Sequence, residues 1–369
     1  MDKNYKLSEN DTLSIVIVIM INKLILNIPY YIIQSVGSGT LANIIYIGLI
    51  DFIFLLLIIK LMNKFENQDI IDIAGFLGGK ILKAIVSVVA IGLLFLASYI
   101  TILDFSNVLH TIYFSNFDLI YILLYFIVGI LIANLCGLKS IASVSTFISF
   151  FSIISIIVTF LNTQSNFDIT YITPFFGIDF KTTFLSGLNN TFAIYTLVYI
   201  YFFKPLLKNP KNFKKISIKS FIISFSMLLI TALSMLTIFS SNINVEPINS
   251  LFLLARQIEF GNFLQRIDAL FIFIWIISIF AYLSFTIFLI SRILKKLFNF
   301  ENEKDLSYSL CSILLGLTLI PINITTLHYI EKNIYSRSII IFIFVIGFLI
   351  ISLANLKSRK VKKWKRFLL

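Results

Sequence analysis

Long apolar runs, separated by short polar segments, follow one another along almost the whole chain. About 20 apolar residues are enough for a helix to cross the hydrocarbon core of a bilayer. The pattern therefore predicts an all-α integral membrane protein with ten transmembrane helices, which we number as spans one to ten. Their predicted bounds are 13–36, 41–60, 81–104, 117–136, 140–161, 181–204, 216–240, 267–291, 307–326 and 337–356.

The composition agrees with this interpretation. Of the 369 residues, 59% are hydrophobic and only 13% are charged, whereas about 25% of the residues in a soluble domain are charged. The apolar excess is spread over the full length, which indicates a single membrane domain. No small-residue cleavage site follows the first run, so we expect a first spanning helix and not a removed signal peptide.

Lys and Arg are distributed unevenly between the two sides that the spans define. With the N-terminus inside, 24 of them fall in inner segments, five in outer segments and one, Lys23, within the membrane. Cytoplasmic loops of membrane proteins carry this excess, so both termini are predicted to be cytosolic. The net charge of +12, including the basic cytosolic tail 357–369, then reflects topology and attraction to anionic headgroups of the lipid bilayer, and we expect no nucleic acid partner.

The sequence contains none of the common catalytic motifs, such as a Walker loop, HExxH or GxSxG. Cys136 and Cys311 are interpreted as small apolar fillers. His110 and His328 fall in predicted loops, far from any partner motif. We therefore expect no enzyme, no metal site and no cofactor.

Two charged residues lie near the middle of predicted spans. A lysine there costs about 2.5–3.5 kcal/mol on insertion scales, so we expect Lys23 in span one to have a partner or a function that offsets this cost. Asp51 in span two lies at a similar depth, and the two could pair across adjacent antiparallel helices. Alternatively, each meets backbone carbonyls or water separately. Asp104 and Asp268 lie at span ends and are interpreted as interfacial.

Span one also contains residues that disturb a helix. Pro29 lacks an N–H group and its ring clashes with the carbonyl four residues before it. Asn22 and Asn27 can bond freed backbone groups. A discontinuous helix around residues 22–29 is predicted, with a simple proline kink as the alternative. Irregular backbone at membrane depth is tolerated only against protein or a water-filled cavity.

Span six is interrupted in the same way, around Gly187, Asn189 and Asn190. Broken helices at corresponding positions of two halves are typical of an inverted repeat with a binding site between them. We therefore predict a five-plus-five inverted repeat, approximately 13–161 and 181–326, with a tenth helix 337–356 completing the second half.

Several stretches resemble the endospore germination permease family, within the amino acid–polyamine–organocation superfamily. They include "LSENDT" before span one, "KLILNIP" within it, "LGGKILK" opening span three, "YFFKPLLKNPKNFKK" after span six and "FLQRIDALFIFIWIISIF" opening span eight. The chain is similar to a spore germination receptor B subunit. It departs from the family at Thr196 to Val198, where members have Gly-Phe-Glu, and at Asp268, where they have Glu.

The resemblance implies a LeuT-like core in the inner membrane of a spore. It implies a subunit that senses a small-molecule germinant, most often an amino acid, together with a membrane A subunit and a lipoprotein C subunit. It places the ligand pocket between spans one, three, six and eight. The candidate ligand-binding residues are Asn22, Asn27, Tyr99, Asn189, Asn190, Tyr195, Tyr282 and Thr286.

Three functions stay open at this point. The first is a ligand sensor, the second is a secondary transporter of amino acids or related solutes, and the third is a scaffold. A scaffold has no use for Lys23, which disfavours the third. Lys23 could replace a coupling cation or titrate as a proton site.

The outer segment 241–266 is expected to form a short interfacial helix or a solvated loop.

Overall fold

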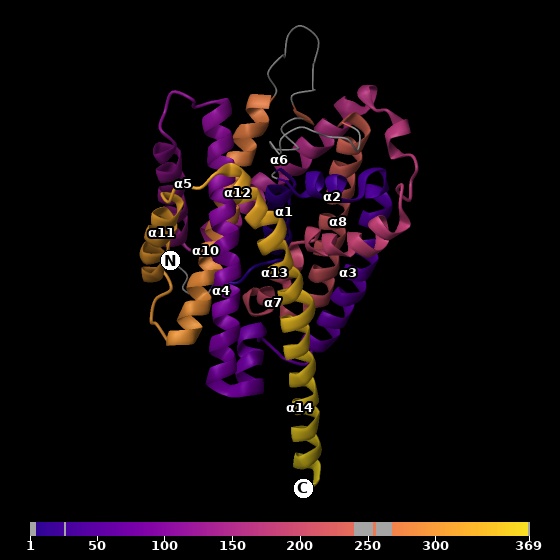
Figure 1. Cartoon of the computed structure of the whole chain (residues 1–369). Coiled ribbons are helices and arrows are strands. Elements are labelled where there is room, and N and C mark those ends of the chain that lie inside the picture. The colour runs from indigo at the N-terminus through magenta and orange to yellow at the C-terminus, as the bar shows by residue number, and fades with distance from the viewer. Residues whose placement is uncertain (1–4, 26, 240–253, 256–267, 368–369) are drawn as a thin grey trace.

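A computed structural model describes residues 5–25, 27–239, 254–255 and 268–367, and in these residues the chain is helical throughout, apart from turns and one isolated bridge between Leu7 and Leu207. The helices form one upright bundle, and the last helix extends beyond its lower end (Figure 1). The α-helices are α1 (Glu9–Ile25), α2 (Ile28–Val36), α3 (Thr40–Met62), α4 (Ile70–Ile112), α5 (Leu119–Cys136), α6 (Leu138–Thr163), α7 (Thr196–Phe203), α8 (Phe213–Phe239), α10 (Asp268–Phe298), α11 (Asp305–Thr318), α12 (Ile324–Tyr329), α13 (Ser336–Ile340) and α14 (Phe348–Phe367).

Shorter π- and 3-10-helical segments join or extend these helices. The π-helical segments are Lys181–Leu185, Ile330–Tyr335 and Ile341–Gly347. The 3-10 segments are Gly37–Gly39, Gln164–Asn166, Ile169–Ile172, Ser186–Ala193, Lys204–Leu206 and Pro210–Asn212.

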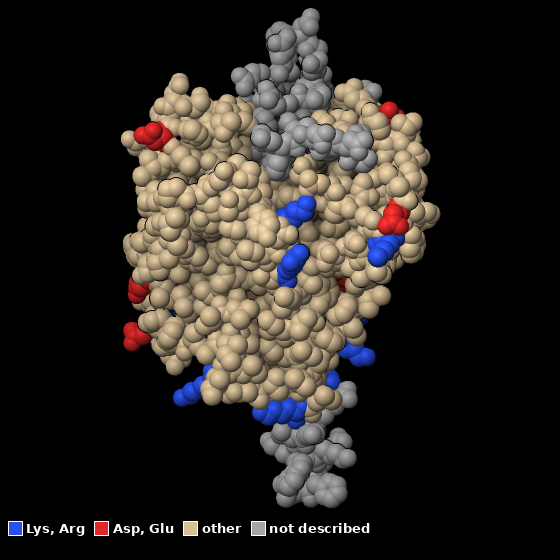
Figure 2. All heavy atoms as spheres, in the orientation of Figure 1, with Lys and Arg blue, Asp and Glu red and all other residues tan. Residues whose placement is uncertain are grey.

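Seven helical stretches in the described residues are long and apolar enough to cross a membrane. The chain is therefore an all-α, multi-pass integral membrane protein. The remaining predicted spans correspond to helices that are short or interrupted, namely α1, the segment from Lys181 to Phe203, and α11. The number of ten spans stays a prediction. Figure 2 shows several Lys and Arg side chains at the lower end of this face and a few more higher up, on a surface with few other charges.

Helix α1 forms the centre of the bundle. It packs against α6, α8 and α10, and its side chains are buried on every face from Ser14 to Ile25. A helix that is apolar all round is expected in such a position. Any polar side chain on α1, including Lys23, is therefore placed in the interior of the protein and not against lipid.

Basic residues at the lower end cap helices. Lys204 donates to the carbonyl oxygens of Met62 and Phe65, both at 2.6 Å, just where α3 ends. Lys357 donates to the carbonyls of Phe76 and Leu77, both at 2.9 Å. Carbonyls at helix C-termini lack intrahelical partners, so a lysine there supplies both a hydrogen bond and a favourable charge.

The chain turns sharply inside α4 before it enters span three. Gly78 and Gly79 have non-helical backbone angles, and the φ of Gly79 is 67°, which favours glycine. The short helix before this bend starts at a capping box in which Asp69 and Asp72 exchange side-chain hydrogen bonds with each other's backbone. The "LGGK" stretch therefore marks a change of direction.

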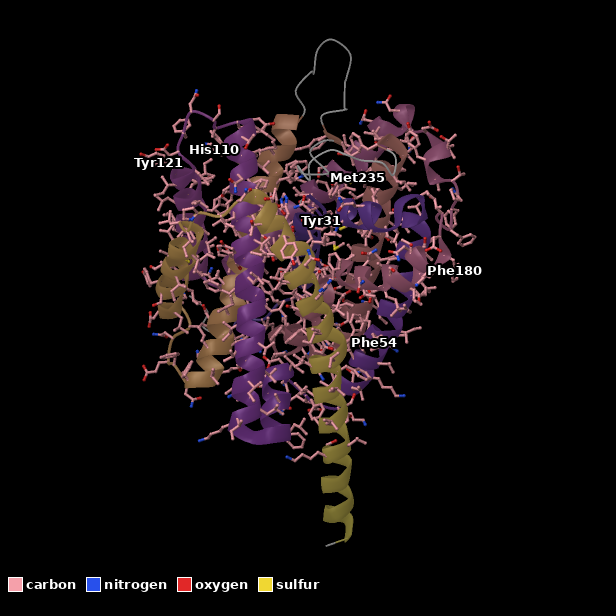
Figure 3. The ribbon with its side chains drawn as sticks, viewed as in Figure 1. Tyr31, Phe54, His110, Tyr121, Phe180 and Met235 are labelled. Atoms are coloured by element: carbon pink, nitrogen blue, oxygen red, sulfur yellow. The ribbon has the colours of Figure 1, made fainter. Side chains whose placement is uncertain are left out.

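Some predicted bounds were wrong. Span three continues beyond residue 104 to Ile112, so that His110 lies in the last turn of a helix and not in a loop (Figure 3). The predicted ninth span 307–326 is interrupted, because α11 ends at Thr318. The helical stretch that includes span ten begins at Ile324, earlier than predicted. The predicted interfacial helix in 241–266 lies outside the described residues, apart from residues 254–255.

Candidate functional site

Span one is broken between α1, which ends at Ile25, and α2, which begins at Ile28. Asn27 precedes α2 with a non-helical φ of −124° and ψ of −2°. Pro29 lies in the first turn of α2, where its missing N–H is not needed. The interruption predicted for residues 22–29 is therefore present, and the helix remains regular through Asn22 and Lys23.

Span six is also interrupted. It begins as a π-helical turn and continues as the 3-10 segment Ser186–Ala193. Ile194 then leaves the helical region with φ −88° and ψ 60°, before α7 starts at Thr196. Gly187 lies within the 3-10 segment, so the irregularity extends on both sides of the predicted position.

Buried polar side chains gather above the break in span one, and we call them the carboxylate cluster: Asn27, Tyr31, Asp104, His328 and Glu331. The side-chain amide of Asn27 donates to Asp104 at 2.9 Å and to Glu331 at 3.2 Å. The hydroxyl of Tyr31 donates to Glu331 at 2.9 Å, and His328 Nε2 lies 3.2 Å from Asp104 Oδ1. Asp104 and Glu331 are at most 5% exposed. Figure 3 shows Tyr31 in the upper half of the bundle.

One helical turn before Asn27, the Lys23 ammonium lies among three aromatic rings, which we call the tyrosine cage: Tyr195, Tyr282 and Tyr335. Its Nζ is 5.1, 5.7 and 5.3 Å from their centroids. It also donates to Thr101 Oγ1 at 3.2 Å. A cation over aromatic faces is stabilised by the ring quadrupoles, most strongly when it is desolvated. Lys23 and the three tyrosines are at most 3% exposed, so the cage is closed to solvent.

A chain of hydroxyl groups extends from the cage. Tyr282 OH lies 3.1 Å from Tyr195 OH, which lies 3.2 Å from Tyr199 OH, and this in turn lies 3.2 Å from Thr286 Oγ1. Thr286 then donates to the carbonyl of Tyr282 at 2.9 Å. Each hydroxyl can donate and accept, so the chain can transmit a change in hydrogen-bond direction between α7 and α10.

The carboxylate cluster and the tyrosine cage form one site, because Glu331 and Tyr335 belong to the same π-helical segment and Lys23 attracts Glu331 electrostatically. Residues of spans one, three, six, eight and ten meet here. Single π-turns are frequent at functional sites. Among the residues that the structure describes, no group of three or more His, Cys, Asp and Glu side chains is arranged to hold a metal ion.

The structure brings together some of the predicted ligand residues and separates others. Asn27, Tyr195, Tyr282 and Thr286 all belong to this site. Asn22 instead links α1 to α10, because its amide donates to the carbonyl and the hydroxyl of Ser278, both at 3.1 Å.

Two other candidates lie away from the site. Tyr99 is half-buried and makes no hydrogen bond within the described part of the chain, although Thr101 and Asp104 on the same helix reach the cluster. Asn189 is exposed, because it lies on the outer face of the 3-10 segment.

The pair predicted between Lys23 and Asp51 is not formed. Lys23 faces Thr101 and the tyrosines, whereas both carboxylate oxygens of Asp51 are buried without a hydrogen-bond partner in the described residues. Equal depth on neighbouring spans does not fix the rotation of each helix about its axis, so it could not show which faces meet.

Asn190 belongs to a second polar group, which holds the irregular half of span six against α3. Its amide donates to Ser35 and Asn43, both at 2.9 Å. Asn43 in turn donates to the carbonyls of Thr183 and Gly187, at 2.8 and 3.1 Å. These carbonyls lack regular α-helical partners, so the asparagines satisfy them.

We expect Gly187→Ala to destabilise this contact, because an added Cβ would lie 2.2 Å from the Asn43 amide nitrogen. Moving Asn43 would leave buried carbonyls unpaired, at roughly 1–3 kcal/mol. The melting temperature of the purified protein should fall by several degrees. Gly316→Ala is the matched control, since nothing lies within 4 Å of its added Cβ. Equal melting temperatures for the two variants would contradict the role given to Gly187.

The sequence interpretation missed the carboxylates and half of the aromatic groups. Asp104 had been assigned to a span end, and His328 to a loop, but both lie in helices because spans three and ten are longer than predicted. Their signal was periodicity. His328, Glu331 and Tyr335 recur at intervals of three and four residues, which places them on one helix face.

The family model described as spore germination protein matches residues 6–327. No curated protein matches the chain significantly. The matched region contains both interrupted spans and ends just before His328, so the contribution of span ten to the site lies outside it. Because the match covers most of the chain, this membrane protein belongs to the spore germination protein family.

Proposed function

We propose that this chain is the germinant-sensing membrane subunit of a spore germination receptor. It binds a small, amino-acid-like ligand near the midplane of the spore inner membrane and signals to a membrane A subunit and a lipoprotein C subunit. The proposal includes a LeuT-like arrangement of ten spans in one membrane domain, with repeats 13–161 and 181–326 and both termini cytosolic. The two interrupted helices, five spans apart, support that arrangement.

The observation that carries the proposal is the meeting of opposite charges at the break in span one. Lys23 offers a fixed cation, and Asp104 and Glu331 offer carboxylates that accept bonds from Asn27, four residues after Lys23. A zwitterion has complementary groups, since its carboxylate suits Lys23 and its ammonium suits the acids and the tyrosine rings. Burial strengthens both interactions.

Ligand binding requires a change of conformation. The cage is closed, and its own side chains occupy the place that a ligand would take. A ligand that binds only an opened form shifts the population toward that form. Because five spans contribute to the site, the shift would move several helices relative to one another, which is the kind of signal that partner subunits can detect.

Secondary transport of amino acids or related solutes is the second candidate. It is favoured by the buried series of Asp104, His328 and Glu331, because acids and histidines in membranes are typical of proton relays. Uptake of the active solute into proteoliposomes separates the two candidates. Accumulation driven by an ion gradient would reject a pure receptor.

Tyr282→Phe tests whether the ligand reaches the cage. The variant keeps the ring and removes one hydroxyl from the chain of hydrogen bonds. One such bond is worth about 1 kcal/mol, and its loss from the closed cage should favour the opened form, so the ligand concentration for half-maximal germination should fall roughly fivefold. Spores carrying the complete receptor are exposed singly to common amino acids, and the loss of optical density is followed. Tyr308→Phe, at an exposed position, is the control. An unchanged dose dependence in Tyr282→Phe would contradict the proposed site.

A further inference from the structure

A second group of charges lies at the lower end of the bundle, away from the ligand site. It surrounds a cavity of about 430 Å³ that opens to the surface. Four of its side chains are basic, and we call the cavity the basic pocket after them: Lys6, Lys208, Arg292 and Lys296. The other lining residues are Asn67, Asp72, Pro205, Leu207 and Pro210.

Four separate parts of the chain build this pocket, and one of them is the segment with Asn67 and Asp72, where α4 begins. The N-terminal segment pairs with the segment after span six, since Leu7 N–H donates to Leu206 and Lys208 N–H donates to Leu7, both at 2.8 Å. Lys6 also donates to the carbonyl of Pro205. The lower part of α10 contributes Arg292 and Lys296. The pocket therefore belongs to the fold and is not a chance meeting of surface chains.

Positive charge in the pocket exceeds negative charge. Lys296 is paired with both nearby acids, at 2.5 Å from Asp69 and 2.6 Å from Asp72. The charges of Lys6, Lys208 and Arg292 therefore leave the pocket with a net positive charge. Burial, with repulsion from Arg292 and Lys296, lowers the pKa of Lys6. Repulsion of this kind indicates that the basic groups are held together without enough anions.

Arg292 supplies an unused donor. Its Nε is buried and has no hydrogen-bond partner among the described residues. Buried donors of native proteins are almost always paired, and Arg292 lines the pocket, so its guanidinium is suited to turn toward a ligand that accepts a hydrogen bond. Arginine with lysines is the combination that proteins use for phosphate groups, because the guanidinium donates to two oxygens and the ammonium adds charge.

We propose that the basic pocket binds one phosphate group. The group belongs either to an acidic phospholipid of the inner leaflet or to a soluble phosphate compound. Binding would hold the N-terminal segment against the end of span six and against α10. It would thereby stabilise the backbone pairing between Leu7 and Leu207. This role is independent of the germinant site.

The test uses the full chain in detergent, with phosphatidylglycerol, phosphatidylcholine, sodium phosphate or sodium chloride added at matched ionic strength. Melting temperature and native mass spectrometry are the measurements. A site for an anionic phosphate predicts stabilisation by phosphatidylglycerol or by sodium phosphate. It predicts none by chloride, or by phosphatidylcholine, whose phosphate is balanced by its own ammonium group. Stabilisation by the lipid alone identifies a headgroup, and stabilisation by sodium phosphate identifies a soluble ligand.

Lys208→Gln should weaken the response at least fivefold, and Arg292→Gln should weaken it at least as much. Lys211→Gln is the matched control, because Lys211 is exposed on the same segment and does not line the pocket. If Arg292→Gln does not fold, the response of Lys208→Gln alone tests the proposal. No stabilisation by either phosphate source, or equal losses in Lys208→Gln and Lys211→Gln, would overturn the proposal.

Discussion

Spores carrying Glu331→Gln should require at least a hundredfold more ligand to germinate than wild-type spores. Glutamine keeps the shape of the side chain and can still accept the bond from Tyr31, but it removes the charge that faces Lys23. Hydrogen bonds to a charged group are worth roughly 1.5–3 kcal/mol each, and Glu331 accepts two of them, from Asn27 and Tyr31. Germination across a range of ligand concentrations is the measurement, with immunoblots to confirm equal amounts of protein.

Glu301→Gln is the control for Glu331→Gln, since Glu301 is an exposed acid in the segment between α10 and α11. Glu331→Asp retains the charge on a shorter arm and should give an intermediate response. If Glu331→Gln accumulates normally and germinates like wild type, the carboxylate cluster does not take part in sensing.

The second large effect is expected for Lys23→Met, which should abolish the response at every ligand concentration. Methionine has a similar length and can fill the tyrosine cage, so the loss of charge is isolated from the loss of volume. Glu331 would then lose the attraction of the Lys23 charge, and the place for a ligand carboxylate would be lost. Lys181→Met, at an exposed position, is the control. Unchanged germination with Lys23→Met would exclude a role for this ammonium.

Combining Lys23→Met with Glu331→Gln separates charge balance from ligand contact. Removing both charges leaves neither group unmatched, so the double variant should accumulate at least as well as either single variant. It should not restore germination. Testing Lys23→Met in sodium, potassium and choline buffers addresses the hypothesis that Lys23 replaces a coupling cation. Recovery in one cation only would support it, and no recovery in any of them would count against it.

The helical nature of the chain and both interruptions could be predicted from the sequence, because they depend on local properties. Apolar runs of sufficient length must form helices in lipid. Pro29 and the cluster of small and polar residues around Gly187 disturb those helices whatever surrounds them. These signals need no knowledge of which helices are neighbours, so they were readable from one chain.

The partners inside the site could not be predicted in this way. Hydropathy assigns a charged residue to water, so Glu331 and Lys332 made the start of the tenth helical stretch resemble a loop. In the structure Glu331 turns inward to Asn27 and Tyr31, and Lys332 donates to Gln34 at 2.6 Å. Such contacts depend on how each helix is rotated about its axis. Neither the depth nor the length of an apolar run indicates that rotation.

The residues from Ile324 to Phe367 form one uninterrupted helical column, from the level of the carboxylate cluster to below the bundle (Figure 1). At about 1.5 Å per residue the column is roughly 60 Å long. In a rigid column of that length, a small tilt at one end moves the other end by a large distance. A tilt of about 10° at Glu331 would carry its far end through roughly 10 Å. The hydrogen bonds of Lys357 to the carbonyls of Phe76 and Leu77 lie partway along this helical column, where they would restrain such a tilt.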